Sequence, residues 1–400
     1  MSILSLVLFV SCGRSFQQKT TNPIGIPMQT RIIDSGTGIG IYPSLGYSSA
    51  GVPYASYQDS SSGTLKIGWL DITGLWDNVD VAGGNGYVNA GAFGSMDIAN
   101  DTYYISYYDP LIHGLEMVSG ALPVVEAPLS PPVITLDKPT NTTYATGVYT
   151  SLKVGPGGTV NISYMDILGQ DPVSISAAYP RYVSWTPSGP SAPEVVDPSI
   201  EGRVLATPLR SIPCSTSIAV AKDGTVWIAY YDVFDKALKI AEKSGTTWTV
   251  QTVDNSGGGE GDGEYQSLVL DSKGYPHLSY TEDTGIATEA LKYAWYDGNS
   301  FHTEDVDRES GVHFGPNSMV LNPSSEPVIA YFDETFNDLK IAFMNNGEWY
   351  TYVLDTALLS GEYPSMALAP TGVPTVAYRQ YAPGFDRITL KFGIVDYNNL

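Results

Sequence analysis

The hydrophobic positions of this chain fall into short blocks separated by Gly, Pro, Asp and Ser, which predicts β-strands joined by turns. Residues 225–232 and 327–333 are typical strand blocks, rich in β-branched and aromatic side chains. Residues 271–276 read Asp-Ser-Lys-Gly-Tyr-Pro, a separator with the chemistry of a hairpin turn. No window of the chain sustains a helical period, so we expect an all-β fold.

The blocks repeat seven times with a period near fifty residues. Each unit opens with a serine and a short apolar strand, and a Tyr-x-acid ending follows thirteen residues after the serine, or twelve in the second unit. A strand that often reads Leu-Lys comes next, and a strand ending in Asp closes the unit. The opening serines are Ser44, Ser95, Ser151, Ser217, Ser267, Ser318 and Ser365. The Tyr-x-acid pairs are Tyr57/Asp59, Tyr107/Asp109, Tyr164/Asp166, Tyr230/Asp232, Tyr280/Glu282, Tyr331/Asp333 and, degenerate, Tyr378/Gln380. Four strands per unit at this period predict a seven-bladed β-propeller with four-stranded antiparallel blades.

The two chain ends are predicted to complete one blade together. Six units end in a closing aspartate, namely Asp80, Asp137, Asp197, Asp254, Asp307 and Asp355. The seventh unit has only three strands, and residues 30–34 match the strand that it lacks. Asp34 lies ten residues before the first opening serine, the same spacing as at the start of the seventh unit. Since paired ends leave no open sheet edge, we expect the N-terminal strand to close the ring.

The first residues predict export. Residues 3–10 form an apolar run of signal-peptide length, too short to span a bilayer. Val-Ser-Cys-Gly at 10–13 resembles the bacterial lipobox, in which the cysteine is lipidated, although Phe9 replaces the usual Leu and no basic residue precedes the run. The predicted domains are a signal peptide with a lipidated Cys12 (1–12), a flexible tether (13–27) and the propeller (28–400). We expect an outer-membrane lipoprotein, or a secreted or periplasmic protein.

Composition narrows the possible partners. The net charge is −22, from 42 acidic residues against 20 Lys and Arg, which argues against a nucleic-acid partner because phosphate contacts need clustered basic residues. An acidic surface favours solubility and cations. Lipidation of Cys12 would leave Cys214 without a partner, so no internal disulfide is expected. We expect a monomer outside any complex, with membrane contact only through the lipid anchor.

Two units depart from the regular pattern. Unit two carries Pro110 and the Pro-rich stretch 127–132. Unit three carries Pro180 and the Pro-rich stretch 184–213, and 66 residues separate its opening serine from the next. Extra length in a repeat array goes to loops, often on the binding face, and a neutral solvent loop is the alternative.

The recurring tyrosine and acid each have two interpretations. The tyrosines could stack on sugars, but one position repeated in every unit and flanked by apolar residues favours packing between blades with a satisfied hydroxyl. The acid either caps its turn or pairs with a lysine of the third strand, or it contributes with its counterparts to a ligand-binding face. That lysine occurs in five units, as Lys66, Lys239, Lys292, Lys340 and Lys391.

Catalytic motifs are missing from the sequence. The histidines share no metal-ligand spacing, and neither a Gly-x-Ser-x-Gly elbow nor a phosphate-binding loop occurs; the histidines are His113, His277, His302 and His313. We therefore assign no catalytic residue, and the interpretation leans against an enzyme.

A ligand site is predicted between units two and three on the top rim, where the acid-bearing strand ends and the loops between units meet. In these units the lysine position is predicted to hold Glu116 and Ser174. The acids Asp109 and Asp166 would then lack a local counter-charge and require a cation or a basic partner group. Hard oxygen ligands favour Ca²⁺, and solvated acids are the alternative. The predicted ligand or cation residues are Asp109, His113, Glu116, Asp166 and Asp171.

Residues 28–400 resemble a class of secreted bacterial repeat proteins whose units read Ser-Leu-x-Leu-Asp-x-x-Gly-x-Pro-x-Ile-Ser-Tyr-x-Asp, followed by Leu-Lys-Tyr-Ala. Residues 267–294 carry the clearest copy. The resemblance implies a propeller that is distantly sialidase-like in form, and it implies no activity. The Asp-box of sialidases is not matched, and the arginines do not recur at one blade position.

We therefore expect a non-enzymatic binding or scaffold module of a bacterial cell-envelope lipoprotein. Its partner would be a protein or a glycan at the top face. A carbohydrate-binding lectin and a sialidase-like or other propeller hydrolase are the alternatives.

Overall fold

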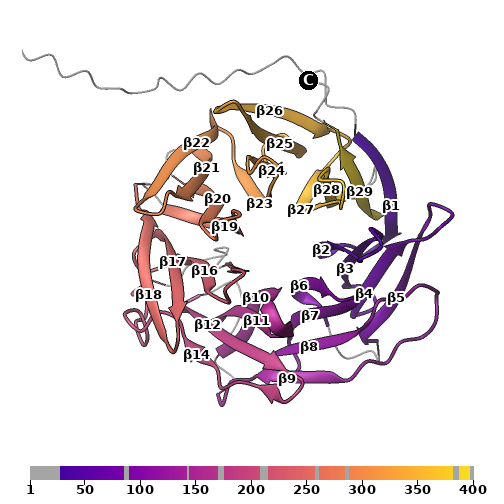
Figure 1. The fold of residues 1–400 in the computed structure, drawn as a ribbon, viewed down its shortest axis with the longest axis horizontal. Coiled ribbons are helices and arrows are strands. Elements are labelled where there is room, and N and C mark those ends of the chain that lie inside the picture. The colour runs from indigo at the N-terminus through magenta and orange to yellow at the C-terminus, as the bar shows by residue number, and fades with distance from the viewer. Residues whose placement is uncertain are drawn as a thin grey trace, which may run out of the picture.

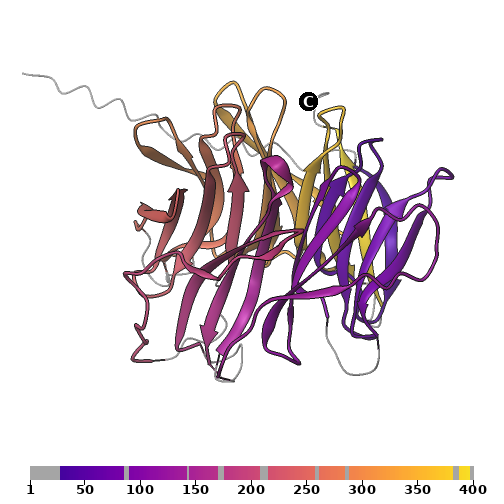
Figure 2. The same ribbon diagram turned by 60° about the horizontal axis from the view of Figure 1, so that its bottom comes forward.

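The computed structural model describes residues 28–84, 90–141, 144–169, 175–207, 215–256, 261–283, 288–381 and 387–396. These residues form seven antiparallel sheets arranged as a ring, which confirms the predicted seven-bladed β-propeller. Figure 1 views the ring along its axis, with the innermost strand of each blade nearest the centre, and Figure 2 shows the blades from a tilted direction. The predicted signal peptide and tether, with Cys12, lie outside the described residues, as do Cys214, Asp171 and Ser174.

Blades 1 to 3 follow one another along the chain. Blade 1 consists of β2 (Ile41–Tyr47), β3 (Pro53–Asp59), β4 (Thr64–Leu70) and β5 (Trp76–Gly83). Blade 2 consists of β6 (Ala92–Ala99), β7 (Thr102–Asp109), β8 (Gly114–Ala121) and β9 (Val133–Asp137). Blade 3 consists of β10 (Tyr144–Val154), β11 (Val160–Leu168), β12 (Ala177–Thr186), β13 (Gly189–Pro190) and β14 (Glu194–Val195), with a single 3₁₀ turn, η1 (Pro156–Gly158), between β10 and β11.

Blades 4 to 7 complete the ring. Blade 4 consists of β15 (Thr216–Val220), β16 (Val226–Asp232), β17 (Ala237–Ser244) and β18 (Thr247–Asp254). Blade 5 consists of β19 (Gly261–Leu270), β20 (Pro276–Asp283), β21 (Thr288–Tyr296) and β22 (Phe301–Ser310). Blade 6 consists of β23 (Phe314–Leu321), β24 (Pro327–Asp333), β25 (Asp338–Asn345) and β26 (Glu348–Asp355). Blade 7 consists of β27 (Ser360–Leu368), β28 (Pro374–Tyr381), β29 (Ile388–Val395) and β1 (Met28–Gly36).

The N-terminal strand closes the ring, as predicted. Strand β1 pairs antiparallel with β29, so that Met28 lies opposite Val395 and Gly36 lies opposite Ile388. Blade 7 is thus built from both ends of the chain. Strand β1 supplies its fourth, outermost strand and covers the edge of β29.

The opening serines form a ring of hydrogen bonds around the central axis. Each serine hydroxyl accepts a hydrogen bond from the next blade. The donor is the backbone N–H of the residue directly after that blade's opening serine. Met96 donates in this way to Ser44 at 3.0 Å, and Leu45 donates to Ser365 at 3.0 Å where the ring closes. The other five serines accept the equivalent bonds at 3.0–3.2 Å. The invariant serine of the repeat is therefore explained as the inner link between neighbouring blades.

The recurring tyrosines link blades farther from the axis. All seven are at most 1% exposed. Six donate their hydroxyl to the closing aspartate of the preceding blade, at 2.5–2.8 Å; these pairs are Tyr57–Asp34, Tyr164–Asp137, Tyr230–Asp197, Tyr280–Asp254, Tyr331–Asp307 and Tyr378–Asp355. The interpretation as inter-blade packing with a satisfied hydroxyl is therefore confirmed.

The acid of the Tyr-x-Asp pair caps its turn. The carboxylate of Asp232 accepts the backbone N–H of Phe234 at 2.8 Å, and that of Asp333 accepts the N–H of Thr335 at 3.2 Å. In blade 4 the same carboxylate also lies 2.5 Å from Lys239. In these two blades the repeated acid is thus explained by local structure, without a ligand.

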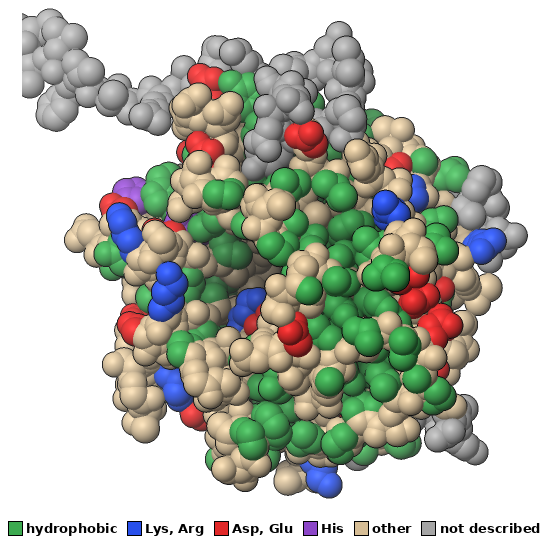
Figure 3. Space-filling model, turned by 45° about the vertical axis from the view of Figure 1, so that its right-hand side comes forward, with side chains coloured by type: hydrophobic (Ala, Val, Ile, Leu, Met, Phe, Trp, Pro, Cys, Tyr) green, Lys and Arg blue, Asp and Glu red, His purple; other side chains and the backbone are tan. Residues whose placement is uncertain are grey.

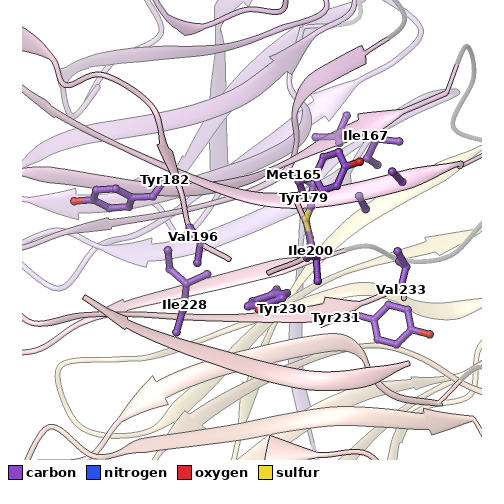
Figure 4. Close-up of a cluster of buried hydrophobic side chains, with 14 of the residues drawn as sticks. Met165, Ile167, Tyr179, Tyr182, Val196, Ile200, Ile228, Tyr230, Tyr231 and Val233 are labelled. Atoms are coloured by element: carbon purple, nitrogen blue, oxygen red, sulfur yellow. The ribbon is translucent and has the colours of Figure 1, made fainter. Parts of the chain in front are cut away.

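The Pro-rich insertion of unit three is partly built into the core. Its prolines split the outer strand of blade 3 into the two-residue strands β13 and β14, both of which pair with β12. The chain then buries Val196 and Ile200 against Ile228 and Tyr230 of blade 4, as Figure 4 shows. At least this part of the extra length is therefore a packed connection between blades 3 and 4 rather than a solvent loop.

Within the described ranges, no helix has the length and the hydrophobicity needed to cross a membrane.

Candidate ligand-binding site

Two of the predicted rim residues, Asp109 and Glu116, lie together in blade 2. Glu116 stands opposite Tyr107 on β8, at the place that lysine takes in other blades, as predicted. It accepts the Tyr107 hydroxyl at 2.9 Å, while Asp109 accepts the backbone N–H of Leu111 at 2.7 Å. Burial raises the pKa of Glu116, and the nearby Asp109 carboxyl raises it further. Glu116 therefore holds a proton more readily than an exposed glutamate does.

The prediction that Asp166 lacks a counter-charge is wrong. Arg181 lies opposite Tyr164 on β12, so it is Arg181, not Ser174, that takes the lysine position in blade 3. Its Nε lies 2.8 Å from Asp166, and its Nη2 lies 2.9 Å from Glu201. The misalignment arose because the segment between β11 and β12 is longer than in the other units, which shifts the third strand along the sequence.

The remaining predicted residues do not assemble a cation site in the described structure. His113 Nδ1 lies 3.2 Å from the Tyr108 hydroxyl. Across the described ranges, no hydrogen bond or ion pair connects Asp109 or Glu116 to Asp166, and no three His, Cys, Asp or Glu side chains are grouped so as to hold a metal. Asp171 lies outside the described residues, so the calcium site stays a prediction.

A different constellation occupies the centre of the top face, where the inner strands begin. Two residues before the opening serine, five blades carry an aromatic side chain. We call this set the aromatic mouth; its members are Tyr42, Phe93, Tyr149, Tyr265 and Tyr363. Four of them line a cavity of about 190 Å³, the exception being Tyr265. Blades 4 and 6 place Ser215 and Pro316 at the equivalent positions, and both line the same cavity.

The backbone of the aromatic mouth is held in an unusual conformation. All five aromatic residues have left-handed φ values of 51–56°. In each of these blades the pairing of the inner strand with its neighbour shifts register near this position, as at a β-bulge. A left-handed conformation costs a non-glycine residue about 1–3 kcal/mol, and such residues concentrate at functional sites. The bulge also changes the direction in which the aromatic side chain points, two residues before each serine.

The rings of the aromatic mouth contact one another in an arc. Ring centroids are 5.1 Å apart for Tyr363 and Tyr42, 4.7 Å for Tyr42 and Phe93, and 4.3 Å for Phe93 and Tyr149. Burial raises the pKa of Tyr42, and the nearby hydroxyls of Tyr363 and Tyr149 add to the rise. Within the described ranges, the hydroxyls of Tyr42, Tyr265 and Tyr363 have no hydrogen-bond partner. The hydroxyls of Tyr42 and Tyr363, whose residues line the cavity, are therefore available to a ligand.

The axis continues below the aromatic mouth as a second cavity. It has a volume of about 420 Å³ and is lined by the seven opening serines and the residues that follow them. The space-filling view in Figure 3 shows the surface hollowed toward the centre of the ring, with hydrophobic side chains bordering the hollow on one side. The opening serines are occupied in holding blades together, whereas the aromatic mouth contains tyrosine hydroxyls that make no hydrogen bond among the described residues.

Charged residues of blades 5 to 7 border the aromatic mouth. His313 Nδ1 lies 2.6 Å from Glu289, and Glu289 raises the pKa of His313. Arg379 Nη1 lies 3.1 Å from Glu362, and Arg379 Nε donates to the Ile39 carbonyl at 3.1 Å. Other arginines form ion pairs elsewhere in the ring, as Arg181 does with Asp166 in blade 3. The described part of the chain therefore contains no arginine cluster at the mouth.

Glu334 is a further acid near the mouth, as is Glu264, which directly precedes Tyr265. It follows Asp333 at the end of β24, and its Oε1 reaches over Gly315, where an added Cβ would meet it at 2.5 Å. Partial burial raises the pKa of Glu334, and the carboxylate of Glu289 raises it further. Its carboxyl has no hydrogen-bond or ion-pair partner among the described residues.

Sequence reasoning missed the aromatic mouth, although the signal was present. Alignment of the units on their opening serines places the five aromatic residues in one column. The column was overlooked because the Tyr-x-acid motif is more regular. Glu334 had no comparable signal, since an acid after the Tyr-x-Asp pair is unremarkable in an acidic chain.

Comparison with known proteins bears on the fold. No family model and no curated protein matches the chain. A solved protein of unknown function from Dyadobacter fermentans DSM 18053 is 14% identical with a TM-score of 0.51, over 92% of this chain and 99% of that one. The polysaccharide lyase Uly1 is 9% identical with a TM-score of 0.54, over 90% of each chain. A mutant of the NanB sialidase from Streptococcus pneumoniae is 11% identical with a TM-score of 0.47, over 93% of this chain and 69% of that one. The two matches with TM-scores above 0.5 show a likeness of fold alone, and the chain is left without an assigned family.

Proposed function

We propose that this protein is a saccharide-binding propeller whose ligand enters the aromatic mouth. The observation that carries the proposal is the repetition of an aromatic residue at one strained position in five blades, around a cavity of about 190 Å³. Blades 4 and 6 hold Ser215 and Pro316 at this position and still join the ring, so a blade does not need an aromatic residue there in order to pack. Backbone strain kept at the aromatic position in five blades suggests a role in binding.

A sugar suits the chemistry of the aromatic mouth. Aromatic faces pack against the C–H faces of a sugar ring, while tyrosine hydroxyls donate and accept hydrogen bonds to sugar hydroxyls. The cavity volume of about 190 Å³ fits a single sugar ring better than a chain. The polysaccharide lyase Uly1 has a similarly shaped ring and acts on saccharides, which is compatible with this ligand class although the likeness extends to the fold alone.

Binding without turnover is the reading we favour. Glycoside hydrolases commonly need two carboxyl groups on either side of the scissile bond. Among the described residues near the mouth, Glu362 is paired with Arg379 and Glu289 with His313, whereas the carboxyl of Glu334 makes no hydrogen bond or ion pair. A sialidase-like or other hydrolase is therefore the alternative, and release of reducing sugar from a bound oligosaccharide would support it.

We also propose that the propeller is exported and tethered to the cell envelope through Cys12. The apolar run 3–10 and the lipobox-like residues 10–13 motivate this proposal. Substitution Cys12→Ser should move the protein from the membrane to the soluble fraction. Unchanged membrane fractionation of that variant would rule out the lipid anchor.

The saccharide proposal is tested by a glycan array followed by titration calorimetry with the best ligand. Phe93→Ala and Tyr363→Ala should each weaken binding by about tenfold or more, since a stacking aromatic residue contributes about 1–2 kcal/mol. Phe336→Ala is the matched control, because Phe336 is an exposed aromatic residue of blade 6 outside the aromatic mouth. Equal losses in all three variants, or no glycan bound by the wild type, would contradict the proposal.

A further inference from the structure

The charges that border the aromatic mouth do not cancel. Glu289 is paired with His313, and Glu362 is paired with Arg379. The Glu334 carboxyl makes no hydrogen bond or ion pair among the described residues, and its Oε1 lies over Gly315, the residue before Pro316 of the cavity lining. A carboxyl group that His313 offsets only in part therefore lies next to the lining of the aromatic mouth.

Both features favour a positively charged ligand group. The faces of aromatic rings carry negative potential and attract an ammonium group, with about 0.5–2 kcal/mol gained per cation–π contact. A carboxylate within reach adds direct charge pairing. The chain as a whole carries a net charge of −22, which raises the local concentration of cations and repels anionic sugars.

The neighbouring basic groups offset this preference only in part. The guanidinium of Arg379 is occupied by Glu362 and the Ile39 carbonyl, and it is 7% exposed. His313 is held by Glu289 at 2.6 Å, although it also lowers the pKa of Glu334. An acidic sugar would thus meet Glu334 without an unpaired cation to receive it.

We propose that the aromatic mouth selects amino sugars, with the ammonium group of a deacetylated hexosamine held between Glu334 and the tyrosine rings. This inference rests on the proposed saccharide-binding function and specifies its ligand class. The sugar ring stacks on the arc formed by Tyr42, Phe93 and Tyr363, and the ammonium group points toward blade 6. An N-acetylated sugar of the same shape has no charge and loses this contact.

The test compares two trisaccharides with the same backbone, the fully deacetylated glucosamine trimer and the N-acetylglucosamine trimer. Calorimetric titration of the full-length mature protein at neutral pH should give at least about tenfold tighter binding of the deacetylated trimer. Glu334→Gln should bring the two affinities together by weakening only the deacetylated trimer. Glu326→Gln is the matched control, because this glutamate lies in the turn before β24, at the opposite end of that strand.

The outcomes separate this inference from the function on which it rests. Equal affinities for the two trimers, or tighter binding of the acetylated one, would overturn the amino-sugar preference while leaving saccharide binding intact. If neither trimer binds but tetramethylammonium does, and Glu334→Gln removes its binding, the cation site stands and the saccharide function fails. If none of the three probes binds, both proposals fail.

Discussion

Blade 6 and blade 2 hold the same tyrosine of the repeat in opposite electrostatic settings. In blade 6, Tyr331 donates to Asp307 of the preceding blade at 2.6 Å, and the Lys340 ammonium lies 2.7 Å from the same carboxylate. In blade 2, Tyr107 donates to Glu116 of its own blade at 2.9 Å. One substitution at the lysine position thus turns an inter-blade contact into an intra-blade contact.

The consequence appears at the boundary between blades 1 and 2. The closing aspartate of blade 1, Asp80, has a 56% exposed side chain and lies 3.5 Å from Lys66 of its own blade. By contrast, the side chain of Asp307 is fully buried between blades 5 and 6. Propeller interfaces therefore tolerate loss of the tyrosine–aspartate contact, because the serine ring and the apolar packing between blades persist.

The largest effect should come from removing the strand that both closes the ring and supplies a closing aspartate. Deletion of Met28–Asp34 removes the partner of β29 and the Asp34 carboxylate that accepts the Tyr57 hydroxyl at 2.8 Å. We expect aggregation or failure to fold, because an open sheet edge and a buried unpaired tyrosine result. Size-exclusion chromatography and thermal melts measure this. A monomeric variant with the wild-type melting temperature would contradict the role of β1.

The contrast between the two blades predicts unequal effects at the lysine position. Lys340→Met leaves the buried Asp307 carboxylate without its cation, at a cost of about 3–5 kcal/mol. Glu116→Gln keeps a hydrogen-bond acceptor for Tyr107 and should change the free energy of unfolding by less than about 1 kcal/mol. Urea denaturation of both variants checks this. Similar losses in both would mean that blade 2 depends on its acid as blade 6 depends on its lysine.

The pH dependence of stability should have opposite signs at Glu116 and Asp355. Burial raises the pKa of Glu116 above its ordinary value of 4.5, so its favourable contribution is present below 4.5 and is lost as the pH rises through the folded pKa. Burial opposes ionisation of Asp355, but the hydrogen bonds from Tyr378 and Lys391 lower its pKa below 3.8. Its contribution is present above 3.8 and is lost as the pH falls through the folded pKa.

Two variants test these signs. Glu116→Gln should become more stable relative to wild type as the pH is raised from about 4 to 7. Asp355→Asn should be less stable than wild type at neutral pH, with the gap narrowing in acid. Denaturation midpoints from about pH 2 to pH 7 give the answer, and parallel curves for the two variants would refute the assignment.

The smallest effect concerns the predicted calcium site between units two and three. If Asp109 and Asp166 contribute to it with Asp171, calcium should raise the melting temperature of the wild type by a few degrees. The double substitution Asp109→Asn/Asp166→Asn should abolish that rise. No calcium response in the wild type would remove the site, and the pairing of Asp166 with Arg181 makes any response small.

The repeat spacing was enough to predict the number of blades, their four-stranded construction and the closing strand. These features follow from local strand patterns and from the need to leave no sheet edge unpaired, and both are visible in one dimension. The role of the recurring tyrosine was predictable for the same reason, since a buried hydroxyl requires a partner.

Tertiary structure decided which side chains meet across blades. The sequence shows that Glu116 replaces a lysine, but only the register of β11 and β12 reveals that Arg181, and not Ser174, stands opposite Tyr164. Insertions shift such positions along the chain, whereas strand pairing aligns them in space. The aromatic mouth depends on closure as well, because Tyr363 and Tyr42 come from opposite ends of the sequence. Their contact exists only when the ring is complete, and it is ring closure that turns one column of the repeat into a cavity.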